Sequence, residues 1–178
     1  AMKAGMADLR CTFELFPRRL PSGRSYGVVA GVGRALEALE KFRFGPEEIK
    51  FLREKSIVDD ETADWLANFK FSGDITGYPE GELFFSGSPV VTVEGGFAEC
   101  VILETLLLSI YNFDSAVASA ASRMTLAAEG RPIIEMGGRR THEWAAVAAG
   151  RAAWVAGFGS SSDLEASRSW DIPVSGTA

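Results

Sequence analysis

The chain has 178 residues, of which 24 are acidic and 18 are basic, giving a formal net charge of −6. This balance argues against a nucleic-acid-binding protein, which would carry a basic face, and a single histidine excludes a metal site built on two imidazoles. Cys11 and Cys100 stand in apolar surroundings without a partner at motif spacing, which predicts two reduced thiols in a cytoplasmic protein.

The first half of the chain predicts a mixed α/β region. Residues 11–16 alternate between apolar and polar side chains as a strand does, and residues 26–30 form a second candidate strand after a proline-rich turn. Apolar residues at helical spacing predict three short helices: Gly33 to Phe42, one from Pro46 and one from about Asp60. Between residues 70 and 94, glycine and proline separate β-forming residues, which predicts several short antiparallel strands.

The middle of the chain, rich in leucine and alanine, predicts helix from Ala98 to about Glu129. We expect a break at residues 112–115, where Asp114 or Ser115 would cap the second half of the helix. The most apolar stretch, residues 100–113, is interrupted by a glutamate and is too short to cross a bilayer, so we expect no membrane span.

The last third predicts strands alternating with helices. The expected elements are a short buried strand over 131–136, a helix over 141–155 capped by Thr141, a helix capped by Ser162 or Asp163, and a strand from Ile172. Strands that alternate with helices form parallel β/α units. The fold class is therefore α/β.

Gly31 and Gly33 follow a strand and open a helix, as the glycines of a dinucleotide-binding fingerprint do. Leu36 stands where the third glycine of that motif belongs, and no acid ends the next strand at the expected distance. A simple turn from strand to helix accounts for these glycines better.

Two glycines and two arginines, Gly137 to Arg140, follow the predicted strand 131–136 and precede a helix. Glycines let a ligand approach the backbone, guanidinium groups recognise carboxylates and phosphates, and a helix start offers N–H donors to an anion. The alternative is a surface loop whose arginines pair with Glu135 or Glu143.

The same arrangement recurs twice further along the chain, at residues 157–163 and 172–177, where small and hydroxyl side chains follow an expected strand. The carboxyl ends of parallel strands meet at one edge of a β/α fold, and such folds bind ligands there. The three segments together predict a site for an anionic or phosphorylated ligand at one rim.

The ordered set of motifs resembles the nicotinate phosphoribosyltransferase family over the whole chain. The matching segments are Thr12–Phe16, Arg18–Pro21, Tyr26–Gly31, Phe71–Ile75, Pro79–Gly81, Leu103–Thr105, Glu135–Arg140, Gly157–Asp163, and Ile172–Val174 with Gly176–Thr177.

The resemblance implies an α+β N-terminal domain over 1–97, connecting helices over 98–130, and over 131–178 the first units of the irregular β/α barrel of type II phosphoribosyltransferases. It implies an ATP-dependent, ligase-type enzyme of NAD biosynthesis that converts nicotinate and 5-phosphoribosyl 1-diphosphate, with Mg²⁺, to nicotinate mononucleotide and diphosphate. It also implies a cytoplasmic homodimer with shared active sites and no nucleic-acid or membrane partner. One alternative is an enzyme that uses nicotinamide or quinolinate as the base. The other is a non-catalytic homologue that binds phosphoribosyl ligands.

Carried over by position, the resemblance places Arg139 at the base and phosphoribosyl site, with Gly138 and Arg140 beside it. It places Thr177 near the nicotinate ring, and Ser162 with Asp163 in a loop facing the same cavity. The family's phosphorylated histidine falls just past Ala178, so we expect these 178 residues to be part of a longer chain and not to complete the reaction alone.

Overall fold

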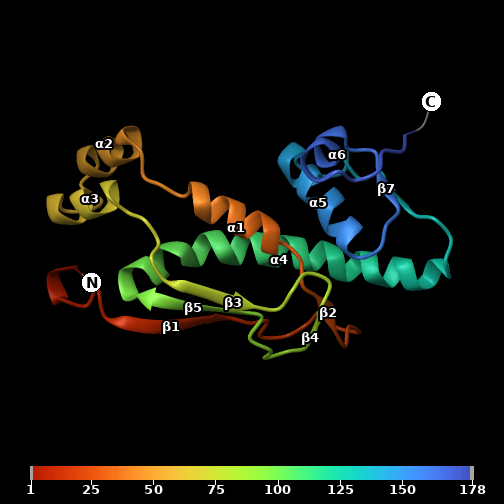
Figure 1. Cartoon of the computed structure of the whole chain (residues 1–178), viewed down its shortest axis with the longest axis horizontal. Helices are drawn as coiled ribbons and strands as arrows, with labels where there is room; N and C mark the ends of the chain where they lie inside the picture. The colour runs from red at the N-terminus through yellow and green to blue at the C-terminus, as the bar shows by residue number, and fades with distance from the viewer. Residues whose placement is uncertain (1, 177–178) are drawn as a thin grey trace.

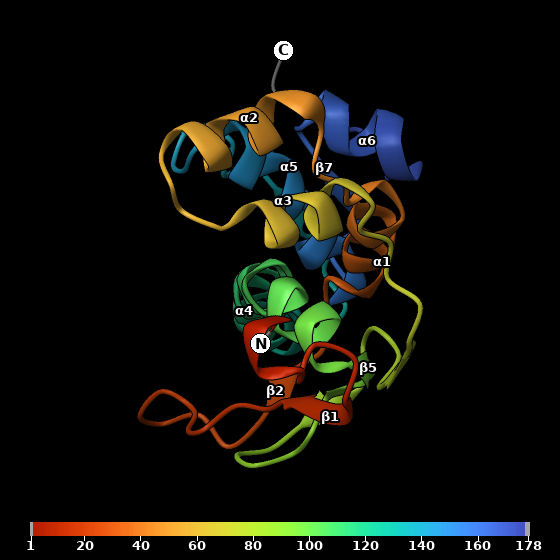
Figure 2. The same ribbon diagram turned by 90° about the vertical axis from the view of Figure 1, so that its left-hand side faces the viewer.

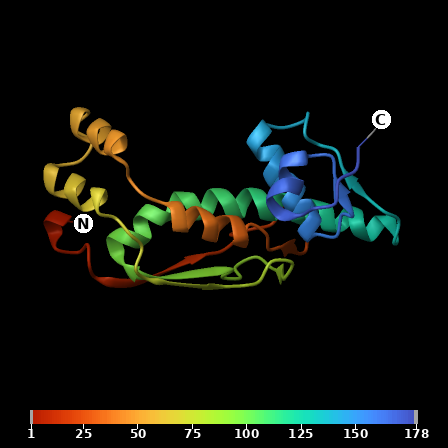
Figure 3. The same ribbon diagram turned by 45° about the horizontal axis from the view of Figure 1, so that its top comes forward.

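The computed structural model describes residues 2–176 and is organised around one long helix, α4 (Phe97–Ala128). In Figure 1 this helix runs along the long axis, with a sheet on one side and the other helices on the opposite side. The end-on view of Figure 2 shows the same order of layers, with α4 between the sheet and α1 and α5. The α2–α3 pair and the α5–α6 pair lie at opposite ends of the molecule (Figures 1 and 3).

The N-terminal sheet has three antiparallel strands in the order β1-β5-β3, which confirms the predicted short antiparallel strands. They are β1 (Arg10–Leu15), β5 (Val91–Gly96) and β3 (Asp74–Gly77). Buried and accessible side chains alternate along β5, because one face of the sheet packs on α4. A separate antiparallel pair joins β2 (Gly27–Val28) to β4 (Leu83–Phe84), and a 3₁₀ turn, η1 (Met2–Ala4), precedes the sheet.

The three predicted short helices are present as α1 (Val32–Lys41), α2 (Pro46–Glu54) and α3 (Asp60–Ala67). Pro46 occupies the first turn of α2, where its missing N–H costs no hydrogen bond. The carboxylate of Asp59 caps α3 by accepting a hydrogen bond from the Thr62 N–H at 2.9 Å. Local capping chemistry therefore sets where these helices begin.

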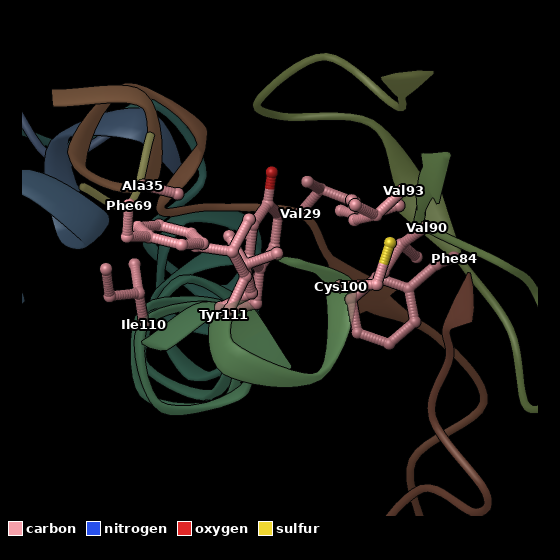
Figure 4. Close-up of a cluster of buried hydrophobic side chains, with 12 residues drawn as sticks. Val29, Ala35, Phe69, Phe84, Val90, Val93, Cys100, Ile110 and Tyr111 are labelled. Carbon is pink, nitrogen blue, oxygen red and sulfur yellow. The ribbon is translucent and has the colours of Figure 1, made fainter. Parts of the chain in front are cut away.

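The main hydrophobic core lies between the sheet, α1 and α4, and Figure 4 shows its side chains. Leu103, on α4, is fully buried there. At one edge of the core, Phe42, Phe44 and Phe69 contact one another edge to face, with ring centroids 5.5 to 6.1 Å apart. This aromatic cluster attaches α1 and the segment after α3 to the central helix.

α4 is continuous through residues 112–115, so the predicted break is wrong. The polar side chains that suggested a break are instead bonded to neighbouring elements. The carboxylate of Asp114 pairs with Arg34 at 2.5 Å, and the hydroxyl of Ser115 accepts a hydrogen bond from the Ala30 N–H at 3.2 Å. Because these side chains find partners outside the helix, they do not compete with its backbone hydrogen bonds.

By length and composition alone α4 could cross a membrane, since its most apolar 18 residues have a mean hydropathy of 1.4. The apolar stretch of residues 100–113 lies inside this longer helix. The helix packs against β1, β2, β5, α1 and α5. Those contacts account for its apolar composition, because a helix covered by protein on several sides needs apolar residues on several faces.

The C-terminal third contains β6 (Ile134–Glu135), α5 (Glu143–Val155), β7 (Ser160–Ser161) and α6 (Leu164–Trp170). The strands β6 and β7 are parallel, which confirms the predicted β/α units. The expectation of a fully buried strand at 131–136 is wrong, since Ile134 is 43% exposed. Successive side chains of a strand point to opposite faces. Ile133 packs on the cluster around Phe158, while within residues 2–176 the opposite face stays uncovered.

Candidate active site

The structure brings the predicted strand ends to one edge. Ile134 pairs with Ser160 and Glu135 with Ser161, and Val174 joins in parallel through a bridge to Ser161. The segments that follow these three strands must then leave the sheet on the same side. Gly138, Arg139 and Arg140 thus share one edge with Ser162 and Asp163, as the sequence predicts, and Thr177 lies outside the described residues.

Glu135, which the sequence presents only as a partner for arginines, is the centre of a hydrogen-bond network. One carboxylate oxygen accepts from the Gly137 N–H at 2.5 Å, and the other accepts from the Ser161 hydroxyl at 2.8 Å. The Ser162 N–H donates to the backbone carbonyl of Glu135 at 2.9 Å. Glu135 therefore ties the loop after β6 to the loop after β7.

Ser161 is fully buried and extends this network to the start of α6. Its hydroxyl oxygen accepts a hydrogen bond from the Asp163 N–H at 3.0 Å while its proton goes to Glu135. Sequence reasoning missed both Glu135 and Ser161 as site residues. The available signal was an acidic residue ending a strand directly before two glycines.

Asp163 is the N-cap of α6, which confirms one of the two predicted caps, Ser162 or Asp163. Its Oδ1 accepts hydrogen bonds from the N–H groups of Glu165 and Ala166 at 2.9 and 3.0 Å. Those bonds fix the side chain against its own helix, which orients the half-buried Ser162 beside it. A direct role for Asp163 and Ser162 toward a ligand remains a prediction.

Gly137 and Gly138 differ in what surrounds them. A Cβ on Gly137 would come within 2.7 Å of the Glu135 carboxylate, whereas a Cβ on Gly138 would meet nothing within 4 Å. Gly137 is therefore the glycine that the network requires, and Gly138 stands beside open space. A ligand can approach the backbone of Gly138 without displacing protein atoms.

Arg139 and Arg140 are exposed, and within residues 2–176 neither forms an ion pair. The alternative in which they pair with Glu135 or Glu143 is wrong, because Glu135 binds Gly137 and Ser161 while Glu143 lies 3.5 Å from His142. The turn that presents them is closed by the Arg140 N–H donating to the Gly137 carbonyl at 2.8 Å. Two guanidinium groups are thus available at this edge.

The helix after this turn begins one residue later than predicted. The N-cap of α5 is His142 and not Thr141, and no side chain makes a capping hydrogen bond there. The first N–H groups of α5 can consequently donate to a ligand or to solvent. Together with Arg139 and Arg140 they offer hydrogen-bond donors to an anion at this edge.

Another cation near the edge, Arg168, already has an ion-pair partner. Hydrogen bonds from Arg168 and Ser169 lower the pKa of the Glu165 carboxyl to about 2. Glu165 and Arg168 therefore remain ionised and paired with each other on α6. At this edge, the cations that form no ion pair within residues 2–176 are therefore Arg139 and Arg140.

A hollow of about 320 Å³ lies elsewhere, between the loop of residues 16–26 and α4. Its walls are mostly apolar, with Arg19 and Arg24 among the lining residues. None of the predicted site residues lines it. We place the candidate site at the strand ends, because three segments of the chain converge there beside the open backbone of Gly138.

Comparison with known proteins shows the family to which the chain belongs. Residues 1–112 match the family model of the nicotinate phosphoribosyltransferase (NAPRTase) N-terminal domain. The chain is 59% identical over all of its residues to a nicotinate phosphoribosyltransferase of Mycobacterium tuberculosis, of which it covers 39%. It is 36% identical over 97% of its residues to the nicotinate phosphoribosyltransferase of Bacillus subtilis and covers 36% of that relative.

The fold is similar to solved structures. The crystal structure of human nicotinic acid phosphoribosyltransferase matches 99% of the chain with a TM-score of 0.91 at 32% identity. A nicotinate-nucleotide pyrophosphorylase from Pyrococcus furiosus matches with a TM-score of 0.75 at 23% identity, which is a likeness of fold. The chain spans less than two fifths of the length of each of these two structures, at 36% and 38%.

Proposed function

Because the chain belongs to the nicotinate phosphoribosyltransferase family, we propose that the protein containing it transfers the phosphoribosyl group of 5-phosphoribosyl 1-diphosphate to nicotinate. The products are nicotinate mononucleotide and diphosphate, and the reaction serves NAD biosynthesis. The observation that carries the proposal is the pair of exposed guanidinium groups of Arg139 and Arg140, which form no ion pair within residues 2–176 and lie beside the open backbone of Gly138.

The substrates are anions that these groups suit. Nicotinate carries a carboxylate on an aromatic ring, and its co-substrate carries a phosphate and a diphosphate. A guanidinium group binds either kind of anion with two parallel hydrogen bonds, and the N–H groups at the start of α5 add further donors. We assign Arg139 to the base and phosphoribosyl site, with Arg140 supporting it.

Beyond binding the anions, the site has to position the base and stabilise the charges that develop during the transfer. Departure of diphosphate builds positive charge on the ribose carbon and negative charge on the leaving group. Fixed cations and dipoles stabilise that separation without having to reorganise, and they hold the base near the reacting carbon. The network of Glu135 and Ser161 supplies the rigidity, because it ties together the loops that carry Arg139 and Ser162.

The family resemblance adds ATP and Mg²⁺ to the proposal. ATP hydrolysis is assigned to a phosphorylated histidine outside residues 1–178. Among residues 2–176, no three His, Cys, Asp or Glu side chains gather as a cation site. Mg²⁺ commonly binds through one or two carboxylates together with substrate phosphates and water, so we assign no residue of this chain to the ion.

We also propose a cytoplasmic homodimer. Val101 and Leu108 lie two turns apart on one face of α4 and are 42% and 44% exposed, which supports an interface along that face. Cys11 and Cys100 are free thiols, which suits a reducing compartment. Light scattering on the purified natural protein tests the assembly, and a mass of one chain at micromolar concentration would contradict it.

The experiment for the activity uses the natural protein that contains this sequence. Initial rates are measured with 5-phosphoribosyl 1-diphosphate and, separately, nicotinate, nicotinamide and quinolinate, each with and without ATP. The proposal predicts the highest kcat/KM with nicotinate and a rate that increases with ATP. Equal or better turnover of either other base would defeat the choice of substrate, and binding of 5-phosphoribosyl 1-diphosphate without any turnover would indicate a non-catalytic homologue.

A further inference from the structure

The Pro79–Gly81 turn between β3 and β4 carries a carboxylate that the candidate site does not use. The two oxygens of Glu80 accept hydrogen bonds from the two terminal nitrogens of Arg151 at 2.5 and 2.7 Å. One of those oxygens also accepts from the Gly31 N–H at 2.7 Å. Glu80 therefore connects the N-terminal sheet region to α5 and to the first turn of α1.

This ion pair is largely removed from solvent, with side-chain exposures of 21% for Glu80 and 12% for Arg151. Burial alone would raise the pKa of Glu80, but the hydrogen bonds and charge of Arg151 outweigh it and leave that pKa below its ordinary value. Both groups are thus charged at neutral pH. A buried, bidentate pair has one preferred geometry, so it constrains direction as well as distance.

A second buried pair lies beside the first. Asp114 of α4 is fully buried and pairs with Arg34 of α1 at 2.5 Å. Gly31 has a φ of 97°, and a Cβ there would come within 3.1 Å of the Asp114 carboxylate, so a glycine favours the close approach of the two pairs. The N-terminal region, α1, α4 and α5 therefore meet at one charged cluster.

The position of α5 bears on the candidate site, because the backbone of Gly150, the residue before Arg151, lies against its hydrogen-bond network. A Cβ on Gly150 would lie 3.1 Å from the Ser161 hydroxyl and 3.7 Å from a carboxylate oxygen of Glu135. The Arg151 guanidinium also lies 5.5 Å from the ring centre of Trp170, at the end of α6. A lateral shift of α5 would therefore move Glu135, Ser161 and α6 together.

We propose that Glu80 is a positioning residue for the candidate active site: through Arg151 it fixes α5, and through α5 it fixes the loops that follow β6 and β7. This role rests on the proposed function in one respect, namely that the positioned loops bind the substrates. It requires no contact between Glu80 and a substrate.

The test uses the natural protein containing this sequence and a double variant, Glu80→Gln with Arg151→Met. The double variant removes both charges while the glutamine oxygen still accepts from the Gly31 N–H, so the fold does not contain an unpaired buried charge. Asp64→Asn is the matched control, since it breaks the exposed 2.5 Å pair between Asp64 and Arg53, which is remote from the site. Each protein is measured for thermal unfolding, for amide hydrogen exchange without ligand, and for kcat and KM with nicotinate.

We expect the double variant to unfold at nearly the wild-type temperature, because well-packed neutral replacements of a buried pair are often neutral in stability. Its amide exchange over residues 136–142 and 161–163 should rise about tenfold, because local opening becomes easier. Its kcat should fall about tenfold with a smaller change in KM, since misplaced groups lose transition-state stabilisation. Asp64→Asn should match the wild type in all three measurements.

Amide exchange at the wild-type rate in both loops of the double variant would overturn the proposal. A lower unfolding temperature without faster exchange in these loops would also overturn it. If the double variant does not fold, Glu80→Gln alone decides by the same exchange measurement. A wild type without transferase activity would defeat the proposed function instead, and the exchange rates would still decide the role of Glu80.

Discussion

Single residues set the junctions of this fold, and Gly31 is the most constrained of them. It has φ of 97° at the start of α1, and a Cβ there would lie 3.0 Å from Ile110 and 3.1 Å from Asp114. The sequence predicts a glycine turn at this point but gives no reason for the side chain to be missing. The reasons are the positive φ and the contact with Ile110 and Asp114 of α4, and Asp114 lies 83 positions away along the chain.

Gly31→Ala should therefore lower the free energy of unfolding by about 2 to 4 kcal/mol, from backbone strain together with the steric clash. Gly23→Ala is the matched control, because Gly23 also has positive φ, at 77°, but no atom within 4 Å of a Cβ. It should cost only about 1 kcal/mol. Urea unfolding measures both, and equal losses would mean that the contact with Asp114 contributes nothing.

The carboxyl of Asp59 shows how one side chain makes stability depend on pH. Its hydrogen bonds with Thr62, followed by its contact with Lys3 at 3.1 Å, lower its pKa from 3.8 to about 2. A group whose folded pKa is lowered stabilises the fold above its unfolded pKa and loses that contribution as pH falls toward its folded pKa.

Asp59→Asn keeps a capping oxygen but removes the charge. We expect the variant to be less stable than the wild type at neutral pH and the difference to shrink as pH falls from 4 toward 2. Urea unfolding of both proteins across this range measures the difference. A constant difference over the range would contradict the assigned pKa, and Asp59→Ala, which also lacks the cap, should be less stable than Asp59→Asn at neutral pH.

At the scale of elements, local rules predicted the short helices and strands well and failed for the longest helix. Pro46 and Asp163 act within one turn of their own helices, so their effects can be read from neighbouring residues. Asp114 binds Arg34 on α1, and Ser115 binds the backbone of Ala30, which follows β2. Both partners are about 80 residues away along the chain, so no local pattern indicates them. The same limit applies to Glu135, whose partner Ser161 is 26 positions distant.

The packing of α5 on α4 depends on small side chains. Ala118 and Ala152 are fully buried where the C-terminal units meet the central helix, and Ala121 and Ala153 extend the contact. Small residues allow two helices to approach closely, so this interface has little room for a larger side chain.

Ala118→Leu should therefore destabilise the chain by about 1 to 3 kcal/mol through overpacking. Ala116→Leu is the matched control on the same helix, because Ala116 is exposed and leucine is nearly as good a helix former as alanine. Its effect should stay within about 0.5 kcal/mol. Similar losses in the two variants, by urea unfolding, would show that α4 and α5 do not pack as described.

At the scale of the whole molecule, the sequence predicted that three strand ends share one edge, and for the described residues the structure confirms that convergence. The motifs near these strand ends contained the predicted binding residues because loops at the edge of a β/α fold carry function. The charged cluster of Glu80, Arg151, Arg34 and Asp114 could not be predicted, because its members come from four separate segments. It joins the sheet region to the β/α units, so it belongs to the assembled fold and to no single motif.

The central claim is that the turn after β6 binds the anionic substrates, and Arg139→Ala tests it most directly. Arg131→Ala is the control, since Arg131 is an exposed arginine just before β6 whose guanidinium donates to the Ala128 carbonyl of its own segment at 3.4 Å. The measurement is kcat/KM for nicotinate in the natural protein containing this sequence. We predict a fall of about 100-fold or more for Arg139→Ala, because a charge-assisted contact to a reacting anion is lost, with unchanged thermal unfolding and near wild-type activity for Arg131→Ala. A wild-type kcat/KM in Arg139→Ala would contradict the account.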